Sequence, residues 1–127
     1  MNQAESRPRV LLVEDEALIA MLLEDMLSDL GCDVIATAPQ IDEAVALART
    51  ETIDLAIVDI NLRGVPAYPV ACALRERRIP FAFVTGYGAA GTDPAYRDVP
   101  VLQKPFRGEH LESIVQLLRT QGCTADS

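Results

Sequence analysis

The sequence of 127 residues has no tryptophan, one histidine and a single lysine, Lys104. It also lacks a long hydrophobic run, since no segment approaches the roughly 20 apolar residues that cross a bilayer. Residues 1–8 have no apolar stretch of the kind found in signal peptides. These absences exclude a membrane-spanning protein and predict a cytoplasmic one.

Cysteine and positive charge are also scarce. The three cysteines show no metal-binding spacing, so we expect reduced thiols, with Cys32 and Cys72 packed inside the protein. Eleven basic residues stand against 19 acidic ones, which gives a net charge of −8. The chain therefore lacks the basic surface that displaces counterions from nucleic acids. Its acidity suits a cation site or a partner with a basic patch.

Strand and helix patterns alternate along the chain. Strands are expected at residues 9–13, 33–37, 55–59, 81–85 and 101–103, and helices at about 17–30, 41–50, 69–78 and 107–120. This alternation predicts an α/β fold, with a parallel five-stranded sheet in the order 2-1-3-4-5 inside a flavodoxin-like three-layer sandwich. We expect one domain, residues 9–120, between an N-terminal extension, 1–8, and a loose polar tail, 121–127.

Residues 86–100 depart from this alternation. They include Gly86, Gly88, Gly91, Pro94 and Pro100, and a helix interior loses about 1 kcal/mol for glycine and about 3 kcal/mol for proline. The fourth helix of the fold is therefore expected to be short or mobile. Such a segment is either a surface excursion or a functional loop, and its place after the fourth strand favours a functional loop.

Four predicted strands end in polar side chains. Glu14 and Asp15 follow the first strand, Asp59 ends the third, Thr85 ends the fourth and Lys104 follows the fifth. Each alone has an ordinary explanation, such as a helix N-terminal charge, a strand-end cap or a solvated lysine. In a sheet of this order, however, these strand ends converge on the edge where open α/β sheets bind ligands. Their coincidence favours a reactive centre.

Three crowded carboxylates repel one another, which raises their pKa values unless a cation neutralises them. Mg²⁺ fits best, because it binds a few carboxylates and keeps water and phosphate oxygens as its other ligands. Beside Mg²⁺, Asp59 could attack phosphorus and form an aspartyl phosphate. Lys104 would then neutralise one phosphoryl oxygen, and the Thr85 hydroxyl would donate to another. The residues predict a phosphoryl acceptor with no evident base for activating water.

Over about residues 10–118, the sequence resembles the receiver domains of bacterial two-component response regulators. The resemblance is carried by Val13-Glu14-Asp15, Val58-Asp59, Thr85 and Lys104-Pro105-Phe106. It implies that Asp59 accepts a phosphoryl group from a histidine kinase or a histidine phosphotransfer protein. It also implies Mg²⁺ held by Asp15, Asp59 and the Asn61 carbonyl, with Glu14 contributing through water. A cis Lys104–Pro105 bond, and slow self-dephosphorylation in place of enzymatic turnover, are further implications.

Residues 80–87 resemble the Pro-Phe-x-Phe-Ala-Thr-Gly-Tyr motif of a class of mostly stand-alone receivers, with Val84 in place of alanine. Most receivers carry an aromatic switch residue three positions before the lysine, where this chain has Val101. Tyr87, on the loop after Thr85, is the candidate replacement, although it could equally serve in packing. The resemblance implies a monomer or weak dimer that signals through a downstream protein partner or acts as a phosphate sink.

Two other functions remain open. A phosphatase of the haloacid-dehalogenase type also uses an aspartate nucleophile with Mg²⁺, but it carries a second aspartate where this chain has Asn61. A binding-only pseudo-receiver would never be phosphorylated, which the acidic residues, Thr85 and Lys104 argue against. His110 lies early in the last predicted helix and is expected to be a solvated surface residue.

Overall fold

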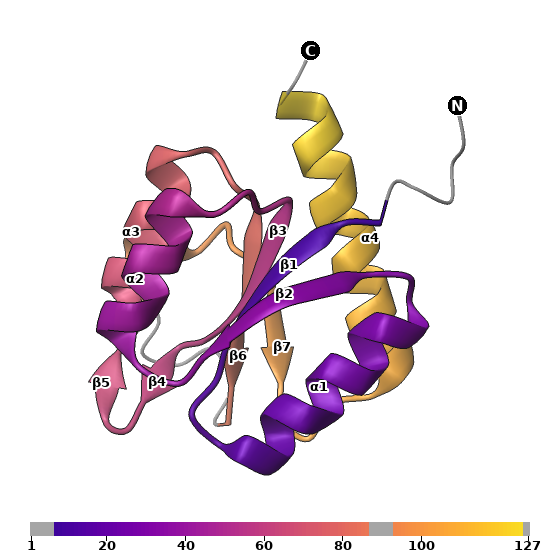
Figure 1. The fold of residues 1–127 in the computed structure, drawn as a ribbon, viewed down its shortest axis with the longest axis horizontal. Helices are drawn as coiled ribbons and strands as arrows, with labels where there is room; N and C mark the ends of the chain where they lie inside the picture. Colours follow the sequence, from indigo (N-terminus) through magenta and orange to yellow (C-terminus); the bar gives the residue numbers. More distant parts are fainter. Residues whose placement is uncertain (1–6, 87–92, 126–127) are drawn as a thin grey trace.

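The computed structural model describes residues 7–86 and 93–125, with side chains as far as residue 121. Within these residues, one sheet has five parallel strands in the order β2-β1-β3-β6-β7. The strands are β1 (Arg9–Val13), β2 (Asp33–Ala38), β3 (Leu55–Asp59), β6 (Phe81–Thr85) and β7 (Val101–Gln103). The predicted strand order and flavodoxin-like sandwich are confirmed (Figure 1).

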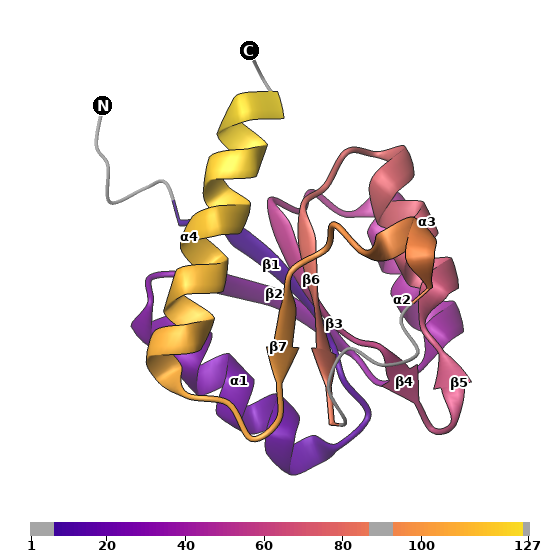
Figure 2. The same cartoon turned by 180° about the vertical axis from the view of Figure 1, so that it is seen from behind.

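Four helices cover the two faces of the sheet. Helices α1 (Ala17–Asp29) and α4 (Gly108–Ala125) lie on one face, and α2 (Ile41–Thr50) and α3 (Tyr68–Glu76) lie on the other (Figures 1 and 2). Helix α4 continues beyond residue 120, through most of the predicted loose tail. That segment has no proline, and its one glycine costs a helix only about 1 kcal/mol.

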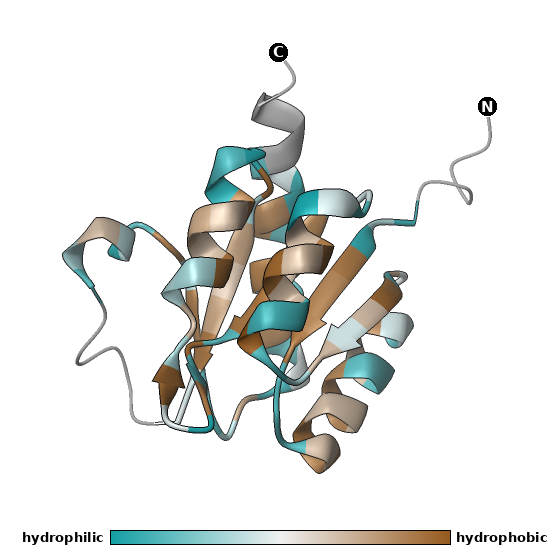
Figure 3. Ribbon diagram, turned by 60° about the vertical axis from the view of Figure 1, so that its left-hand side comes forward, coloured by the Kyte–Doolittle hydropathy of each residue, from teal (hydrophilic) through white to brown (hydrophobic). Residues whose placement is uncertain are grey.

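The pleat of the strands divides the apolar residues between two clusters. Along β3, Ala56 and Val58 pack towards α2 and α3, whereas Leu55 and Ile57 pack towards α1 and α4. Every residue of β3 and β6 is buried, as expected for parallel strands that are covered on both faces. Figure 3 shows these strands largely in the hydrophobic colour, between helices of mixed hydropathy. No helix in the described part of the chain is both long and apolar enough to cross a membrane.

One prediction about the core is wrong. Cys72 is exposed on α3, whereas Cys32 is buried as expected. The inner side of α3 is already formed by the four buried residues Val70, Ala71, Ala73 and Leu74. At the helical period of 3.6 residues, position 72 then falls on the outer side.

The irregular segment after β6 contains one short helical turn in its described part. This is the 3₁₀ turn η2 (Pro94–Tyr96), which agrees with the expectation of a short fourth helix. The Tyr96 ring stacks on Tyr68 of α3 with ring centroids 5.3 Å apart, and the Arg75 guanidinium lies 4.7 Å from the Tyr96 centroid. Tyr87, the predicted switch residue, lies outside the described residues.

A short hairpin follows β3. Its strands are β4 (Asn61–Leu62) and β5 (Val65–Pro66), which pair in antiparallel fashion. The loop between them has two residues, Arg63 and Gly64, and both have positive φ. The hairpin lies beside the carboxyl end of β3 (Figure 2), so it borders the edge where the candidate site was predicted.

Candidate functional site

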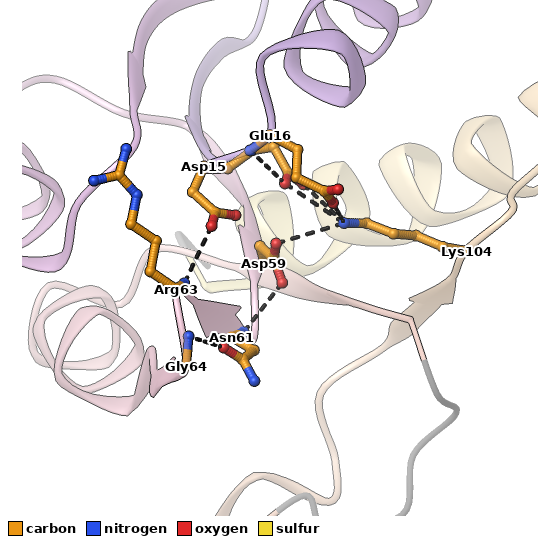
Figure 4. A network of polar contacts seen from close by, with 8 residues as sticks. Asp15, Glu16, Asp59, Asn61, Arg63, Gly64 and Lys104 are labelled. Carbon is orange, nitrogen blue, oxygen red and sulfur yellow. Dashed lines mark hydrogen bonds and ion pairs between the residues drawn. The ribbon is translucent and has the colours of Figure 1, made fainter.

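The register of the sheet brings the predicted site residues to one edge. Parallel pairing sets Val13 of β1 opposite Val58 of β3, and Asp59 opposite Val84 of β6. The acidic pair that follows β1 therefore lies beside the aspartate that ends β3. One carboxylate oxygen from each of Glu14, Asp15 and Asp59 lies within 4.8 Å of the others. This acidic cluster is drawn with its polar neighbours in Figure 4.

Two members of the acidic cluster are buried. Glu14 is 2% exposed and Asp59 is 5% exposed. Burial, and then the negative charge of Asp59, raise the pKa of Glu14 to about 7. Burial also raises the pKa of Asp59, although the Asn61 N–H, Glu14 and Lys104 act to lower it. The charged forms of these carboxylates are therefore disfavoured in the absence of a cation.

The chemistry of the cluster fits a hard divalent cation. Glu14 Oε1 is buried and has no hydrogen-bond partner among the described residues, and a buried carboxylate oxygen without a donor is costly. All three side chains offer oxygen, which is the ligand type of Mg²⁺ and Ca²⁺. The half-buried Asp15 leaves one side of the cluster open to solvent.

Lys104 supplies the positive charge at this edge. Its Nζ lies 3.5 Å from Asp59 Oδ2 and 3.4 Å from Glu14 Oε1. Burial acts to lower the pKa of Lys104, but the hydrogen bond with Glu16 and the charges of Asp59 and Glu14 outweigh it and raise the pKa. Lys104 therefore remains an ammonium group beside the carboxylate of Asp59.

The shortest contact of the Lys104 side chain is with a residue that sequence reasoning missed. Its Nζ donates to Glu16 Oε1 at 2.9 Å, and Glu16 is exposed at the start of α1. The adjacent acidic pair could have drawn attention to Glu16. Its role depends, however, on the direction of the Lys104 side chain, which only the structure shows.

Thr85 ends β6 and is buried at this edge of the sheet. Its carbonyl accepts a hydrogen bond of 2.8 Å from the Lys104 N–H, which ties the end of β6 to the residue after β7. The Lys104–Pro105 peptide bond is cis, as the resemblance implied. His110 is exposed, as expected for a surface residue.

Asn61 lies directly after the acidic cluster. Its N–H donates to Asp59 Oδ1 at 3.0 Å, and its side-chain Oδ1 accepts from the Gly64 N–H at 2.7 Å. Across the hairpin Asn61 pairs with Pro66, which has no N–H to offer the Asn61 carbonyl. The side chain of Asn61 thus closes the hairpin, and its backbone N–H binds Asp59.

Comparison with known proteins gives one family. The response regulator receiver domain matches residues 10–116. The transcriptional regulatory protein PdtaR of Mycobacterium tuberculosis is 33% identical over 113 residues, which are 86% of this chain and 55% of that protein. The chain spans about half the length of the curated relatives that it matches.

Solved structures agree with this match. SdrG from Sphingomonas melonis Fr1 has a TM-score of 0.80 and 43% identity, over 88% of this chain and 96% of that chain. The response regulator PhyR from Brucella abortus has a TM-score of 0.79 and 28% identity, over 94% of this chain and 51% of that chain. The family match over residues 10–116 includes the acidic cluster and Lys104.

Proposed function

This chain belongs to the response regulator receiver family, and from that premise we propose that Asp59 accepts a phosphoryl group from a phosphohistidine. The donor is a histidine kinase or a histidine phosphotransfer protein. The observation that carries the proposal is the placement of Asp59: a buried carboxylate at a strand end, beside two other acids and an ammonium group 3.5 Å away. Few structural roles require this combination of charges.

The transfer would proceed by attack of an Asp59 carboxylate oxygen on phosphorus. The bond from phosphorus to the histidine nitrogen breaks, and the imidazole leaves with its electron pair and takes up a proton. The Asn61 N–H at 3.0 Å from Oδ1 would orient the carboxylate, and Lys104, with its Nζ 3.5 Å from Asp59 Oδ2, would neutralise charge on the phosphoryl oxygens. The Thr85 hydroxyl is proposed as a further donor.

The acidic cluster is proposed to hold Mg²⁺. Asp15, Asp59 and the Asn61 carbonyl would be its protein ligands, with Glu14 acting through water. When bound, the ion supplies positive charge that draws the carboxylates together and offsets the charge of the phosphoryl group. The buried Glu14 Oε1, which accepts no hydrogen bond among the described residues, and the all-oxygen donor set support this assignment.

Signalling output is proposed to begin at Thr85 and to continue through Tyr87 on the loop that follows. Support comes from Val101, whose position on β7 offers no aromatic ring for the relay used by most receivers. The receiver, residues 9–120, would act in the cytoplasm as a monomer or weak dimer, through a downstream protein or as a phosphate sink. The likeness to SdrG, over 88% of this chain and 96% of that chain, supports the receiver assignment.

A phosphatase of the haloacid-dehalogenase type is less well supported by the site. Such an enzyme needs a general acid two residues after its nucleophile, which is the position of Asn61. The Asn61 side chain accepts a hydrogen bond from Gly64 and has no acidic proton to give. Slow self-dephosphorylation of Asp59, without turnover of other substrates, is the activity that we propose.

Labelling of Asp59 tests the proposal. The purified protein is incubated with Mg²⁺ and acetyl phosphate, and intact mass spectrometry detects the added phosphoryl group. Asp59→Asn should abolish labelling, whereas Asp54→Asn, which alters an exposed aspartate just before the same strand, should leave it intact. A labelled Asp59→Asn protein would overturn the proposal. A phosphorylated histidine kinase domain can then replace acetyl phosphate as the donor.

A further inference from the structure

The β4–β5 hairpin adopts a backbone conformation that its sequence does not favour. The φ angles of Arg63 and Gly64 are 54° and 84°, and a two-residue loop with both φ values positive corresponds to a type I′ turn, which normally uses Asn-Gly. Arginine is disfavoured in this region because its Cβ crowds the backbone. Two contacts support the turn: Leu62 is buried at 3% exposure, and Asn61 Oδ1 accepts from the Gly64 N–H.

This hairpin also presents backbone donors to the acidic cluster. The Arg63 N–H lies 3.1 Å from Asp15 Oδ2, and the Asn61 N–H lies 3.0 Å from Asp59 Oδ1 (Figure 4). Among the described residues, Asp15 accepts no other hydrogen bond and forms no ion pair. The orientation of the Asp15 carboxylate therefore depends on the backbone of the turn.

We propose that the hairpin is a positioning element for the metal site: its type I′ turn holds the Arg63 N–H where it orients Asp15. This inference rests on the proposed function, in which the acidic cluster holds Mg²⁺. Because Mg²⁺ demands near-ideal octahedral geometry, a ligand that loses its orienting partner binds the ion less well, typically by 10- to 100-fold. Arg63 and Gly64 act through Asp15 and are positioning residues.

Gly64→Ala tests the proposal, because alanine is strained at a φ of 84° while nothing lies within 4 Å of the added Cβ. Gly31→Ala is the matched control: Gly31 has a φ of 85° and equally open surroundings, but it lies at the far end of α1. The Mg²⁺ dissociation constant is measured by isothermal titration calorimetry without a phosphodonor. We expect about a tenfold increase for Gly64→Ala and no change for Gly31→Ala. Equal Mg²⁺ binding by the two variants would overturn the proposal.

Two further measurements distinguish the contribution of the Arg63 backbone N–H to Mg²⁺ binding from that of the Arg63 guanidinium. Arg63→Gly removes the guanidinium but keeps the N–H and the positive φ, so Mg²⁺ binding should match that of the wild type. A loss as large as that of Gly64→Ala would assign the effect to the guanidinium and contradict the proposal. In the wild type, Mg²⁺ should slow hydrogen exchange of the Arg63 amide and leave the Gly31 amide unaffected; unchanged exchange at Arg63 would also contradict it.

The outcomes distinguish this inference from the proposed function. A wild-type protein that neither binds Mg²⁺ nor becomes labelled on Asp59 would refute the proposed function itself. A wild type that does both, together with a Gly64→Ala variant that binds Mg²⁺ equally well, would refute only the positioning role of the hairpin.

Discussion

The two edges of the sheet differ in the burial of their acidic side chains, which are exposed at the amino edge and largely buried at the carboxyl edge. At the amino edge, the exposed Asp54 accepts a hydrogen bond of 2.7 Å from the Arg9 N–H, and Arg9 Nε donates to the Thr52 carbonyl. At the carboxyl edge, Glu14 and Asp59 are buried. At the amino edge, exposed hydrogen bonds join the start of β1 to the residues that precede β3. The carboxyl edge instead buries negative charge, which costs stability but suits a cation.

Removal of the single lysine should have the largest effect. Lys104→Ala takes away the ammonium group that lies 3.5 Å from Asp59, and loss of one preorganised charge at a reacting group typically costs about a hundredfold in rate. Initial rates of labelling by acetyl phosphate should fall by that amount. Arg9→Ala, at the amino edge, is the control and should label at the wild-type rate. If the two variants label alike, the division of roles between the edges is wrong.

The metal-free protein should lose stability as the pH rises. The pKa of Glu14 is about 7 in the folded protein against 4.5 without burial, so the folded state binds more protons between these values. Protonation therefore favours folding, and the free energy of unfolding should fall by roughly 2 kcal/mol from pH 5 to pH 8. The raised pKa of Asp59 acts in the same direction.

Urea unfolding in EDTA at the two pH values measures this change. Addition of Mg²⁺ should restore most of the loss at pH 8, because the ion binds the deprotonated carboxylates. A metal-free protein that is more stable at pH 8 than at pH 5 would contradict the prediction.

Glu14→Gln should make the metal-free protein more stable. The substitution keeps the shape of the side chain but removes a buried charge whose Oε1 has no hydrogen-bond partner among the described residues. We expect a gain of about 1 kcal/mol in the free energy of unfolding at pH 8 and a shallower dependence on pH. Mg²⁺ should bind this variant more weakly, which calorimetry can establish. A loss of stability at pH 8 would mean that Lys104 already compensates the charge.

The smallest effect is expected at the amino edge. Asp54→Asn keeps an oxygen that can accept from the Arg9 N–H and removes one exposed charge. Interactions of exposed charged groups contribute about 1 kcal/mol or less. The free energy of unfolding, measured with urea, should therefore change by no more than about 0.5 kcal/mol at either pH. A larger change would show that this edge also depends on its charges.

The elements of the fold could be predicted because their signals are local. Alternating apolar segments placed the strands and helices, and the order of the sheet brought Glu14, Asp15 and Asp59 to one edge. The contact between Glu16 and Lys104 could not be predicted, because it joins residues 88 positions apart through side-chain directions. Cys72 was misplaced because an apolar residue type was taken as a sign of burial, whereas its neighbours on α3 already fill the inner face.

The hairpin shows a different limit of sequence reasoning. Its residues Asn-Leu-Arg-Gly are typical of a turn, but nothing local requires arginine to adopt a positive φ. The burial of Leu62 and the local hydrogen bond from the Gly64 N–H to Asn61 Oδ1 accompany that conformation, and the burial of Leu62 depends on the packing around the end of β3. Sequence patterns can therefore locate a turn here without giving the direction of its backbone amides.

The complete burial of β3 has a consequence for how the protein tolerates insertions and deletions. Leu55, Ala56, Ile57 and Val58 are apolar on both faces of the sheet, so a shift of the strand by one residue would still bury apolar side chains on each side. Every side chain of β3 would change face, because successive side chains alternate, and Asp59 is the only polar one among them. The number of residues in β3 before Asp59 therefore determines the face of the sheet on which its carboxylate lies. A one-residue insertion in β3 would thus turn Asp59 away from the acidic cluster while leaving the core mostly apolar.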